Sequence, residues 1–357
     1  MPDDELQRGA HVMSVCNACR YCEQYCPVFP AMEQRRTFSA ADLRYLANLC
    51  HNCGECLYAC QYAPPHEFGI NVPKTLAAIR TQSYESYCWP RFLAAAFKRN
   101  SLTTSLTLSV GLIAVMAFAT SLANPDAMAQ GALNADFYAV VPHGVMVTLF
   151  GGVFLFVLAA WGIGLSRFWR EQGRAKVSFP HRALRDILSL RHLHATGVDC
   201  TSAEDTRRPW RRWFHHCTFY GFMLCFASTS VAAIYHSVFG WRAPYDYNSL
   251  PVVLGAIGGL GLLIGPAGLL VVRARRDPAL SNSTDRGLDD SFLVLLFLTS
   301  LTGLVLLVMR NQATMGLLLI VHLGMVLALF LTLPYGKFVH GLYRAAALVK
   351  AAREGAL

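Results

Sequence analysis

Long uncharged stretches dominate the last two thirds of the chain. Six stretches lack Asp, Glu, Lys and Arg; they begin after Arg99, Asp136, Arg212, Asp246, Asp290 and Arg310 and hold 26, 30, 29, 26, 19 and 26 residues. A helix needs about 20 apolar residues to cross ~30 Å of hydrocarbon, and only helices or closed barrels satisfy their backbone polar groups in lipid. Because no alternation of period two is present, we predict six transmembrane helices, at about 102–123, 138–166, 213–239, 249–272, 290–309 and 314–336.

The overall composition agrees with this pattern. Of 357 residues, 54% are hydrophobic and 15% are charged, whereas soluble domains carry about 25% charged residues. This balance excludes a disordered chain, a small disulfide scaffold and a soluble protein that binds nucleic acid through a basic face.

The charged loops indicate an orientation. Segments 167–212, 273–290 and 335–357 hold nineteen Lys and Arg residues, and segments 124–137, 240–249 and 310–314 hold two. Positively charged loops stay on the cytoplasmic side. We therefore expect a multi-pass protein of the bacterial inner membrane with both termini in the cytoplasm, and most of the net charge of +9 reflects this topology.

The first 99 residues form a different region. They have nearly balanced charge, no apolar leader segment and eight of the 12 cysteines. We predict that residues 1–99 are a cytoplasmic domain and that residues 100–357 are a membrane domain.

The eight cysteines form two runs with the same spacing, C-x2-C-x2-C-x3-C. Three closely spaced thiolates can wrap three corners of an iron–sulfur cube, and in two-cluster ferredoxins the fourth ligand comes from the other run. This spacing predicts two 4Fe–4S clusters. The ligands expected for one are Cys16, Cys19, Cys22 and Cys60; those for the other are Cys50, Cys53, Cys56 and Cys26.

Zinc and disulfides fit the cysteine pattern less well. Zinc sites take cysteine pairs from separate knuckles, and a reducing cytoplasm disfavours disulfides. Between the runs, Ser39 and Asp42 have capping-type spacing, and Leu43, Leu46 and Leu49 follow at helical spacing. We therefore predict an all-α protein, with an α-helical two-cluster ferredoxin-like domain before a six-helix cytochrome b-like bundle. The cysteines left over, expected to be small buried apolar residues, are Cys88, Cys200, Cys217 and Cys225.

Six histidines lie in or beside the predicted membrane helices, where ionisable residues indicate function. Facing helices of a bundle hold haem iron with paired imidazoles, and the absence of a CxxCH motif excludes covalent haem. At the inner side we favour the pair His216 and His340, with His215 as an alternative. At the outer side His322 is the firmer ligand, and either His143 or His236 completes the pair.

The position of His340 in the helix pattern supports this choice. His322 and His340 are 18 residues apart, which in one helix is five turns and ~27 Å, with both side chains on the same face. That arrangement suits two haems across the bilayer, although Pro334 kinks such a helix.

The cysteine runs and four further segments resemble the tricarballylate/citrate utilisation protein B family over nearly the whole chain. Those segments are RRWFHH (211–216), FYGF (219–222), APY (243–245) and PYGKFVH (334–340). The resemblance implies a membrane protein with iron–sulfur clusters and b-type haem. It also implies a soluble FAD-dependent partner, a tricarballylate dehydrogenase-like enzyme, whose reduced flavin is reoxidised on the cytoplasmic face with electrons passing to membrane quinone.

The membrane part also resembles the gamma-type cytochrome b subunit of nitrate reductases. In that family the helix corresponding to 213–239 carries a second haem ligand at mid-helix, where this chain has Cys225 and Phe226. This departure leaves the outer pair open and allows one haem instead of two.

Two other functions remain compatible with the residues. One is an electron-transfer subunit of a disulfide- or nitrate-type reductase that runs in the opposite direction. The other is an iron–sulfur redox sensor on a transporter-like domain with a broken helix, for which the glycines of 255–265 and Pro266 offer a position. Close packing of helices through small residues also explains those glycines. In each case the chain is an oxidoreductase component or sensor without a substrate-converting site of its own.

Overall fold

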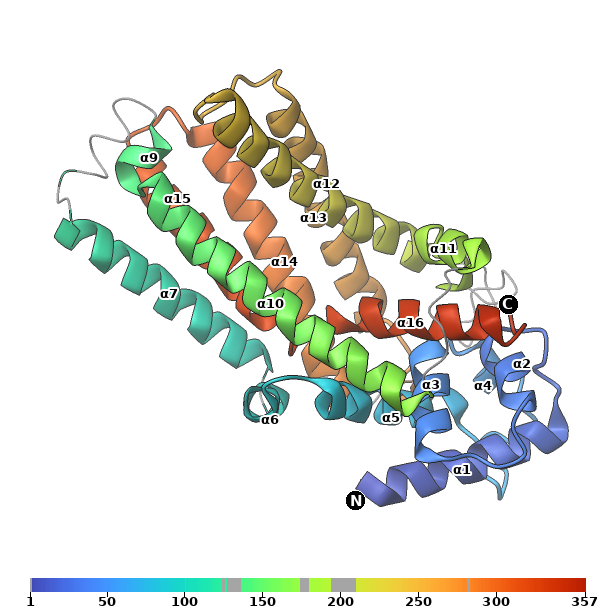
Figure 1. Cartoon of the computed structure of the whole chain (residues 1–357). Coiled ribbons are helices and arrows are strands. Elements are labelled where there is room, and N and C mark those ends of the chain that lie inside the picture. Colours follow the sequence, from blue (N-terminus) through green and yellow to red (C-terminus); the bar gives the residue numbers. More distant parts are fainter. Residues whose placement is uncertain are drawn as a thin grey trace.

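The computed structural model describes residues 2–99, 101–123, 126, 136–173, 180–193, 210–280 and 283–357. Every regular element in this part of the chain is a helix, which confirms the predicted all-α class. Figure 1 shows short N-terminal helices gathered at one end of a bundle of long helices.

The N-terminal unit contains five helices: α1 (Pro2–Cys19), α2 (Val28–Glu33), α3 (Ala40–Leu49), α4 (Glu55–Tyr58) and α5 (Val72–Tyr87). The capping box predicted at the start of α3 is present, since the Ser39 hydroxyl accepts from the Asp42 N–H and the Asp42 carboxylate accepts from the Ser39 N–H. Apolar side chains from α1, α3 and α5 then pack into one core; among the most buried are Met13, Leu46, Leu76 and Ile79.

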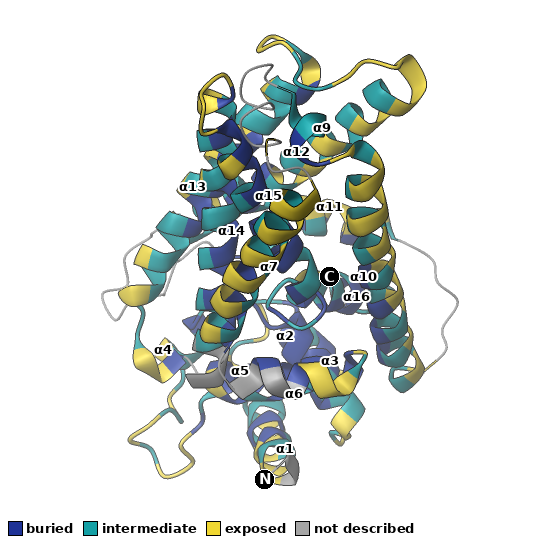
Figure 2. Ribbon diagram, turned by 90° about the vertical axis from the view of Figure 1, so that its left-hand side faces the viewer, coloured by how far each residue is buried: buried dark blue, intermediate teal, exposed yellow. Residues whose placement is uncertain are grey.

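Six helices of the remaining chain are long and apolar enough to span a membrane, so the chain is a multi-pass membrane protein. The short helix α6 (Arg91–Arg99) precedes the first of them. The spanning helices are α7 (Ser101–Ala123), α10 (His143–Glu171), α12 (Trp210–Phe239), α13 (Leu250–Ala274), α14 (Ser283–Met309) and α15 (Met315–Thr332). Figure 2 shows exposed residues along the outward faces of α7 and α10. On α7 these include Val110, Val115 and Phe118, an apolar surface suited to lipid.

Several helix boundaries differ from the predicted ones, and two of these differences lie at prolines. The second spanning helix begins at His143 because Pro142 precedes it, and the separate short helix α9 (Phe137–Val140) lies just before this proline. The sixth spanning helix ends at Thr332, and α16 (Val339–Arg353) begins after a turn that contains Pro334. His322 and His340 therefore lie on different helices, so the argument that placed both on one face of a single helix was wrong.

Small residues let α12 and α13 pack backbone to backbone. A Cβ atom on Gly258 would lie 2.8 Å from the backbone nitrogen of Cys225 and 2.8 Å from the carbonyl oxygen of Gly221. Helix α13 runs unbroken through Pro266. The glycines thus serve helix packing, and the helix break required by the transporter hypothesis is absent from this described segment.

The C-terminal helix α16 joins the membrane bundle to the N-terminal unit. Its Tyr343 and Ala347 belong to the same core as α3 and α5. Beyond its last turn, Glu354 forms an ion pair with Arg35 (2.8 Å) and accepts a hydrogen bond from Tyr45 (3.0 Å). The two ends of the chain consequently lie at the same end of the bundle (Figure 1).

A further short helix lies beside the C-terminal helix. Helix α11 (His181–Leu188) packs against α16, and the single turn η1 (Arg191–Leu193) follows it. Another single turn, η2 (Pro278–Leu280), follows α13 and contacts α5. These pieces surround the space between the membrane bundle and the N-terminal unit.

Candidate functional site

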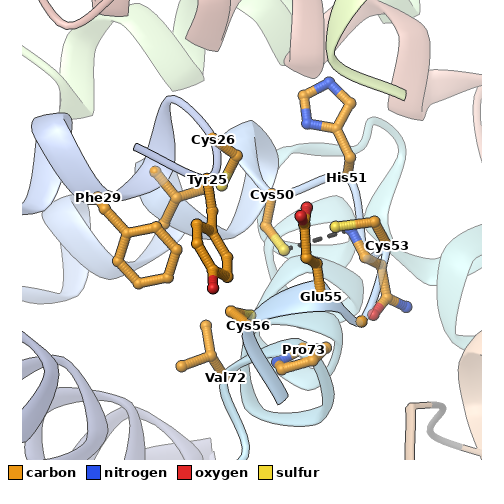
Figure 3. A pocket seen from close by; sticks show the side chains of 13 residues that line it. Tyr25, Cys26, Phe29, Cys50, His51, Cys53, Glu55, Cys56, Val72 and Pro73 are labelled. Carbon is orange, nitrogen blue, oxygen red and sulfur yellow. Dashed lines mark hydrogen bonds between the residues drawn. The ribbon is translucent and has the colours of Figure 1, made fainter. Parts of the chain in front are cut away.

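Eight cysteine side chains gather around two neighbouring cavities of the N-terminal unit. The cysteines that line the first, the Cys50 cavity, are Cys26, Cys50, Cys53 and Cys56. The cysteines that line the second, the Cys16 cavity, are Cys16, Cys19, Cys22, Cys60 and, from the shared wall, Cys56. Each cavity thus receives three cysteines of one run and the last cysteine of the other. Figure 3 shows how the sulfur-bearing side chains lie around the Cys50 cavity.

The sulfurs surround each cavity and do not converge on one point. Across the described residues, no three His, Cys, Asp or Glu side chains lie close enough to hold a single metal ion. A cavity walled by four thiols fits a polynuclear group that keeps its ligands apart.

Tight turns bring the cysteines of each run to one side. Arg20 has a positive φ of 56°, and its N–H donates to the Cys16 carbonyl (2.8 Å) where α1 ends. In the second run Asn52 and Gly54 have φ angles of 53° and 98°. Gly54 suits this left-handed conformation because it lacks a Cβ atom. The Asn52 N–H points back to the Cys50 sulfur, at 3.3 Å.

The surroundings hold the free thiols in their protonated form. Burial, together with the neighbouring Cys60, raises the pKa of Cys16 to about 12 and that of Cys22 to about 12. Burial and the neighbouring thiols also raise the pKa values of Cys26 and Cys56. Metal ligation needs thiolates, so loading these sites must release protons.

The two cavities differ in depth. Tyr21, which lines the Cys16 cavity, is 65% exposed. The Cys50 cavity is lined by buried residues such as Val28 and His51. His51 and Asn52 also line a third, larger cavity on the membrane side. The three cavities therefore follow one another from the surface of the N-terminal unit to the bundle.

We call this third space the histidine cavity. It measures about 440 Å³, within the range of cofactor and ligand sites. Apolar side chains such as Phe222 and Leu296 form one part of its wall. Cationic side chains form another part, and these are Arg80, Arg211, Arg273, Arg276, Lys337 and Arg344.

Two histidines from different helices meet in the histidine cavity. The ring centres of His215 on α12 and His340 on α16 are 6.0 Å apart, and the ring planes make an angle of 81°. Nδ1–H of His340 donates to the Lys337 carbonyl (2.5 Å), which leaves Nε2 with its lone pair. Metal-ligating histidines commonly donate their other nitrogen in this way. The separation leaves room for a metal ion about 2 Å from each ring nitrogen.

The structure places His216, the histidine favoured by the sequence, away from His340. His216 lies outside the cavity wall, and its ring nitrogens are 2.9 Å and 3.2 Å from the carbonyl oxygens of Arg212 and Ser189. Its ring also stacks on Tyr220. Of the two histidines considered at this position, the alternative His215 is the one that lies beside His340.

The predicted outer pair is not formed in the described part of the chain. His322 hydrogen-bonds with the Thr302 hydroxyl (3.1 Å) on α14, and Gly303 makes space for its ring. His143 and His236 instead stack on each other with ring centres 3.7 Å apart, which leaves no room for a metal between them. Helix α15 turns His322 toward α14, and the outer haem pair stays a prediction.

Sequence reasoning did not identify the cations of the histidine cavity. They come from α5, α12, α13 and its C-terminal end, the turn after α15, and α16. Arg211 lies in a segment that carried the family resemblance, but no periodicity linked it to Arg80 or Arg344. Of the cysteines outside the two runs, Cys88 is buried and Cys217 and Cys225 are partly buried; Cys200 lies outside the described residues.

Comparison with known proteins shows which family the chain resembles. Residues 96–356 match the family described as Citrate utilization protein B, and residues 9–86 match the Citrate utilization protein B Fer4-like domain. Citrate utilization protein B of Escherichia coli is 48% identical over 356 residues, which cover 99% of this chain and 93% of that protein. The chain belongs to the citrate utilization protein B family. No solved structure matches it.

Membership of the citrate utilization protein B family confirms the resemblance found in the sequence. The Fer4-like match contains both cysteine runs, and the second match contains all six membrane helices. The N-terminal unit is accordingly the iron–sulfur-type domain of this family, attached to a multi-pass membrane domain.

Proposed function

We propose that the protein transfers electrons from the reduced flavin of a soluble, FAD-dependent, tricarballylate dehydrogenase-like partner to membrane quinone. The observation that carries the proposal is the row of three cavities. The Cys16 cavity reaches the surface, the Cys50 cavity shares a wall with it, and the histidine cavity shares His51 and Asn52 with the Cys50 cavity. Substrate oxidation belongs to the partner, so the chain is an oxidoreductase component.

The cysteine sets would hold two 4Fe–4S clusters. Thiolates of Cys16, Cys19, Cys22 and Cys60 face the Cys16 cavity, and those of Cys26, Cys50, Cys53 and Cys56 face the Cys50 cavity. Four thiolate ligands per cluster satisfy this cofactor. The crossing of the two sets ties the segments around residues 16–26 and 50–60 into one unit.

The histidine cavity would hold one haem b. His215 and His340 would hold the haem iron through ring nitrogens, and the Lys337 carbonyl fixes the orientation of the His340 ring. The apolar wall suits a porphyrin face, and the cations of the cavity offer partners for its carboxylates. When bound, these cofactors supply one-electron carriers between a two-electron flavin and quinone.

The purified full-length protein offers a direct test. Iron, acid-labile sulfide and haem are measured, and a dithionite-reduced minus oxidised spectrum is recorded. We expect iron for two clusters and a b-type spectrum with one haem per chain. Replacement of either axial histidine, His215→Ala or His340→Ala, should abolish the haem signal, whereas the matched control His216→Ala should retain it.

Different results would favour different functions. Retention of haem in His340→Ala overturns the haem site. Iron without any haem would favour the redox sensor or a purely iron–sulfur quinone reductase. Reduction by a flavoprotein dehydrogenase and reoxidation by a quinone analogue test the direction of flow, and reduction by quinol alone would favour the reverse reaction.

A further inference from the structure

Four arginines surround the peptide that contains the first cysteine of the second run. Two of them donate to the Cys50 carbonyl: Arg80 from α5 at 3.1 Å and Arg344 from α16 at 2.6 Å. The guanidinium groups thus reach the same carbonyl from the N-terminal unit and from the C-terminal helix.

The other two arginines reach the next two carbonyls from the membrane helices. Arg211 on α12 donates to the carbonyls of His51 (2.8 Å) and Asn52 (3.3 Å), and Arg276, after α13, also donates to the Asn52 carbonyl. We call Arg80, Arg211, Arg276 and Arg344 the arginine cage. Its members come from four separate parts of the chain and converge on three consecutive residues.

Arg211, Arg276 and Arg344 bring positive charge into the cage. Guanidinium groups remain protonated in proteins, and in the described part of the chain no carboxylate forms an ion pair with Arg211, Arg276 or Arg344. The carboxylate Asp289 of the cavity wall pairs with Arg273 and Lys337. Neutral carbonyl oxygens accept the hydrogen bonds but do not cancel the charge.

Of the described residues that line the Cys16 cavity, none is a lysine or an arginine. Arg20, beside Cys19, is exposed and donates to the Asn17 carbonyl (3.1 Å). Water screens an exposed charge far more than a buried one. Glu55, which is buried, influences both Cys22 and Cys53. Because Glu55 lines the Cys50 cavity and not the Cys16 cavity, its carboxylate opposes reduction mainly at the Cys50 site, and the positive charge of the cage has to outweigh it.

Reduction adds one negative charge to an iron–sulfur cluster, so nearby cations in a low-dielectric site stabilise the reduced form. Hydrogen bonds to the ligand sulfur act in the same direction, and Asn52 supplies one to Cys50. We infer that the arginine cage raises the reduction potential of the cluster held by Cys26, Cys50, Cys53 and Cys56 above that of the other cluster. This inference rests on the proposed function.

A higher reduction potential at the Cys50 cavity would give electron transfer within the chain a preferred direction. One electron would pass from the cluster at the Cys16 cavity to the cluster at the Cys50 cavity. The first cluster would be oxidised and the second reduced, with no bond made or broken. The four arginines of the cage are therefore positioning residues. Their charge makes the cluster beside the histidine cavity the favoured site for the electron. Without the cage, the electron would favour the site nearer the surface.

Redox titration followed by electron paramagnetic resonance tests the inference. In Arg344→Gln and Arg211→Gln, we expect the equilibrium constant for transfer between the clusters to fall at least tenfold. This corresponds to a decrease of about 59 mV in one midpoint potential for a one-electron couple. The signal that shifts should be the higher-potential signal of the wild-type protein. Arg344→Lys, which keeps the charge, should restore most of the potential.

The control is Arg44→Gln, which removes an arginine of α3 already paired with Glu171 and should leave both potentials unchanged. Full iron and sulfide content with unshifted potentials in the Gln variants would overturn this inference alone, as would equal shifts in Arg344→Gln and Arg344→Lys. If Arg344→Gln does not assemble, Arg276→Gln gives the same comparison. Lack of iron and sulfide in the wild-type protein would overturn the proposed function as well.

Discussion

Two adjacent histidines of α12 have different surroundings because successive side chains of a helix are about 100° apart. His215 faces α16 across the histidine cavity, and His216 faces the end of α11. Both have the same predicted depth in the membrane, so hydropathy could not show which of them faces the histidine cavity. The position of α16, which no local pattern indicates, decides between them.

The sequence predicts that the cysteines gather in two groups, but it does not predict the arginine cage, and the reason is physical. A cluster needs four ligands within a short distance, so the spacing C-x2-C-x2-C limits how the chain can fold around it. The side chain of arginine is long, so an arginine that donates to a carbonyl can come from any part of the chain. Arg80 and Arg344 are 264 positions apart and meet at one carbonyl oxygen.

The capping box of α3 offers a test at the level of one residue. Ser39→Ala removes the acceptor of the Asp42 N–H and should lower the free energy of unfolding by about 1 kcal/mol. Thermal unfolding followed by loss of cluster absorbance measures the change. The matched control Ser14→Ala removes a hydroxyl on α1 that donates only to the Ala10 carbonyl and should have little effect; an equal loss in both variants would contradict the capping role.

The same capping box should also contribute acid sensitivity. Burial alone would raise the pKa of Asp42, but hydrogen bonds from Ser39 and Arg35 outweigh it and lower the pKa. The resulting stability is fully present above the unfolded pKa of about 3.9 and is lost as the pH falls through the folded value. In Ser39→Ala this acid-dependent contribution should be smaller.

At the level of elements, the sequence predicts the membrane-spanning helices but does not predict that α15 ends at Thr332. Residues 333–336 carry no charge and continue the uncharged stretch that begins after Arg310, so hydropathy extends the sixth helix beyond its true end. Pro334 cannot continue the backbone hydrogen bonding of a helix, and the chain turns there into α16. The turn carries His340 out of line with His322.

The contact between α12 and α13 gives a prediction for these two elements. Gly258→Ala places a Cβ atom against backbone atoms of Cys225 and Gly221, so the helices must move apart. We expect a loss of about 1–3 kcal/mol in stability, measured as a lower melting temperature in detergent. The control Gly162→Ala, on α10, meets no atom within 4 Å and should be neutral or stabilising because alanine favours helix. Equal melting temperatures for the two variants would contradict close packing.

At the scale of the whole molecule, the contact between the two chain ends lay beyond sequence reasoning. Glu354 pairs with Arg35 across 319 positions, and no periodic signal connects residues so distant. The positively charged loops predicted that both ends lie on one side of the membrane. The structure adds that the C-terminal segment contacts Arg35 of the N-terminal unit and that α16 contributes to the core of that unit.

Topology gives a prediction for the intact protein. Because the positively charged loops flank the end where both termini lie, a C-terminal green fluorescent protein fusion should fluoresce. An alkaline phosphatase fusion at the same position should be inactive, since that enzyme needs the periplasm to form its disulfides. Fusions inserted after Tyr247, between α12 and α13, should behave in the opposite way. An active phosphatase at the C-terminus would invert the proposed orientation.

The position of Arg344 and Glu354 also has a consequence for biogenesis. Both residues are synthesised about 300 positions after the contacts that they make, with the Cys50 carbonyl and with Arg35. The N-terminal unit therefore obtains these contacts only after α16 has been translated. Iron–sulfur assembly factors must either serve a domain that is still open or wait until the finished protein has entered the membrane.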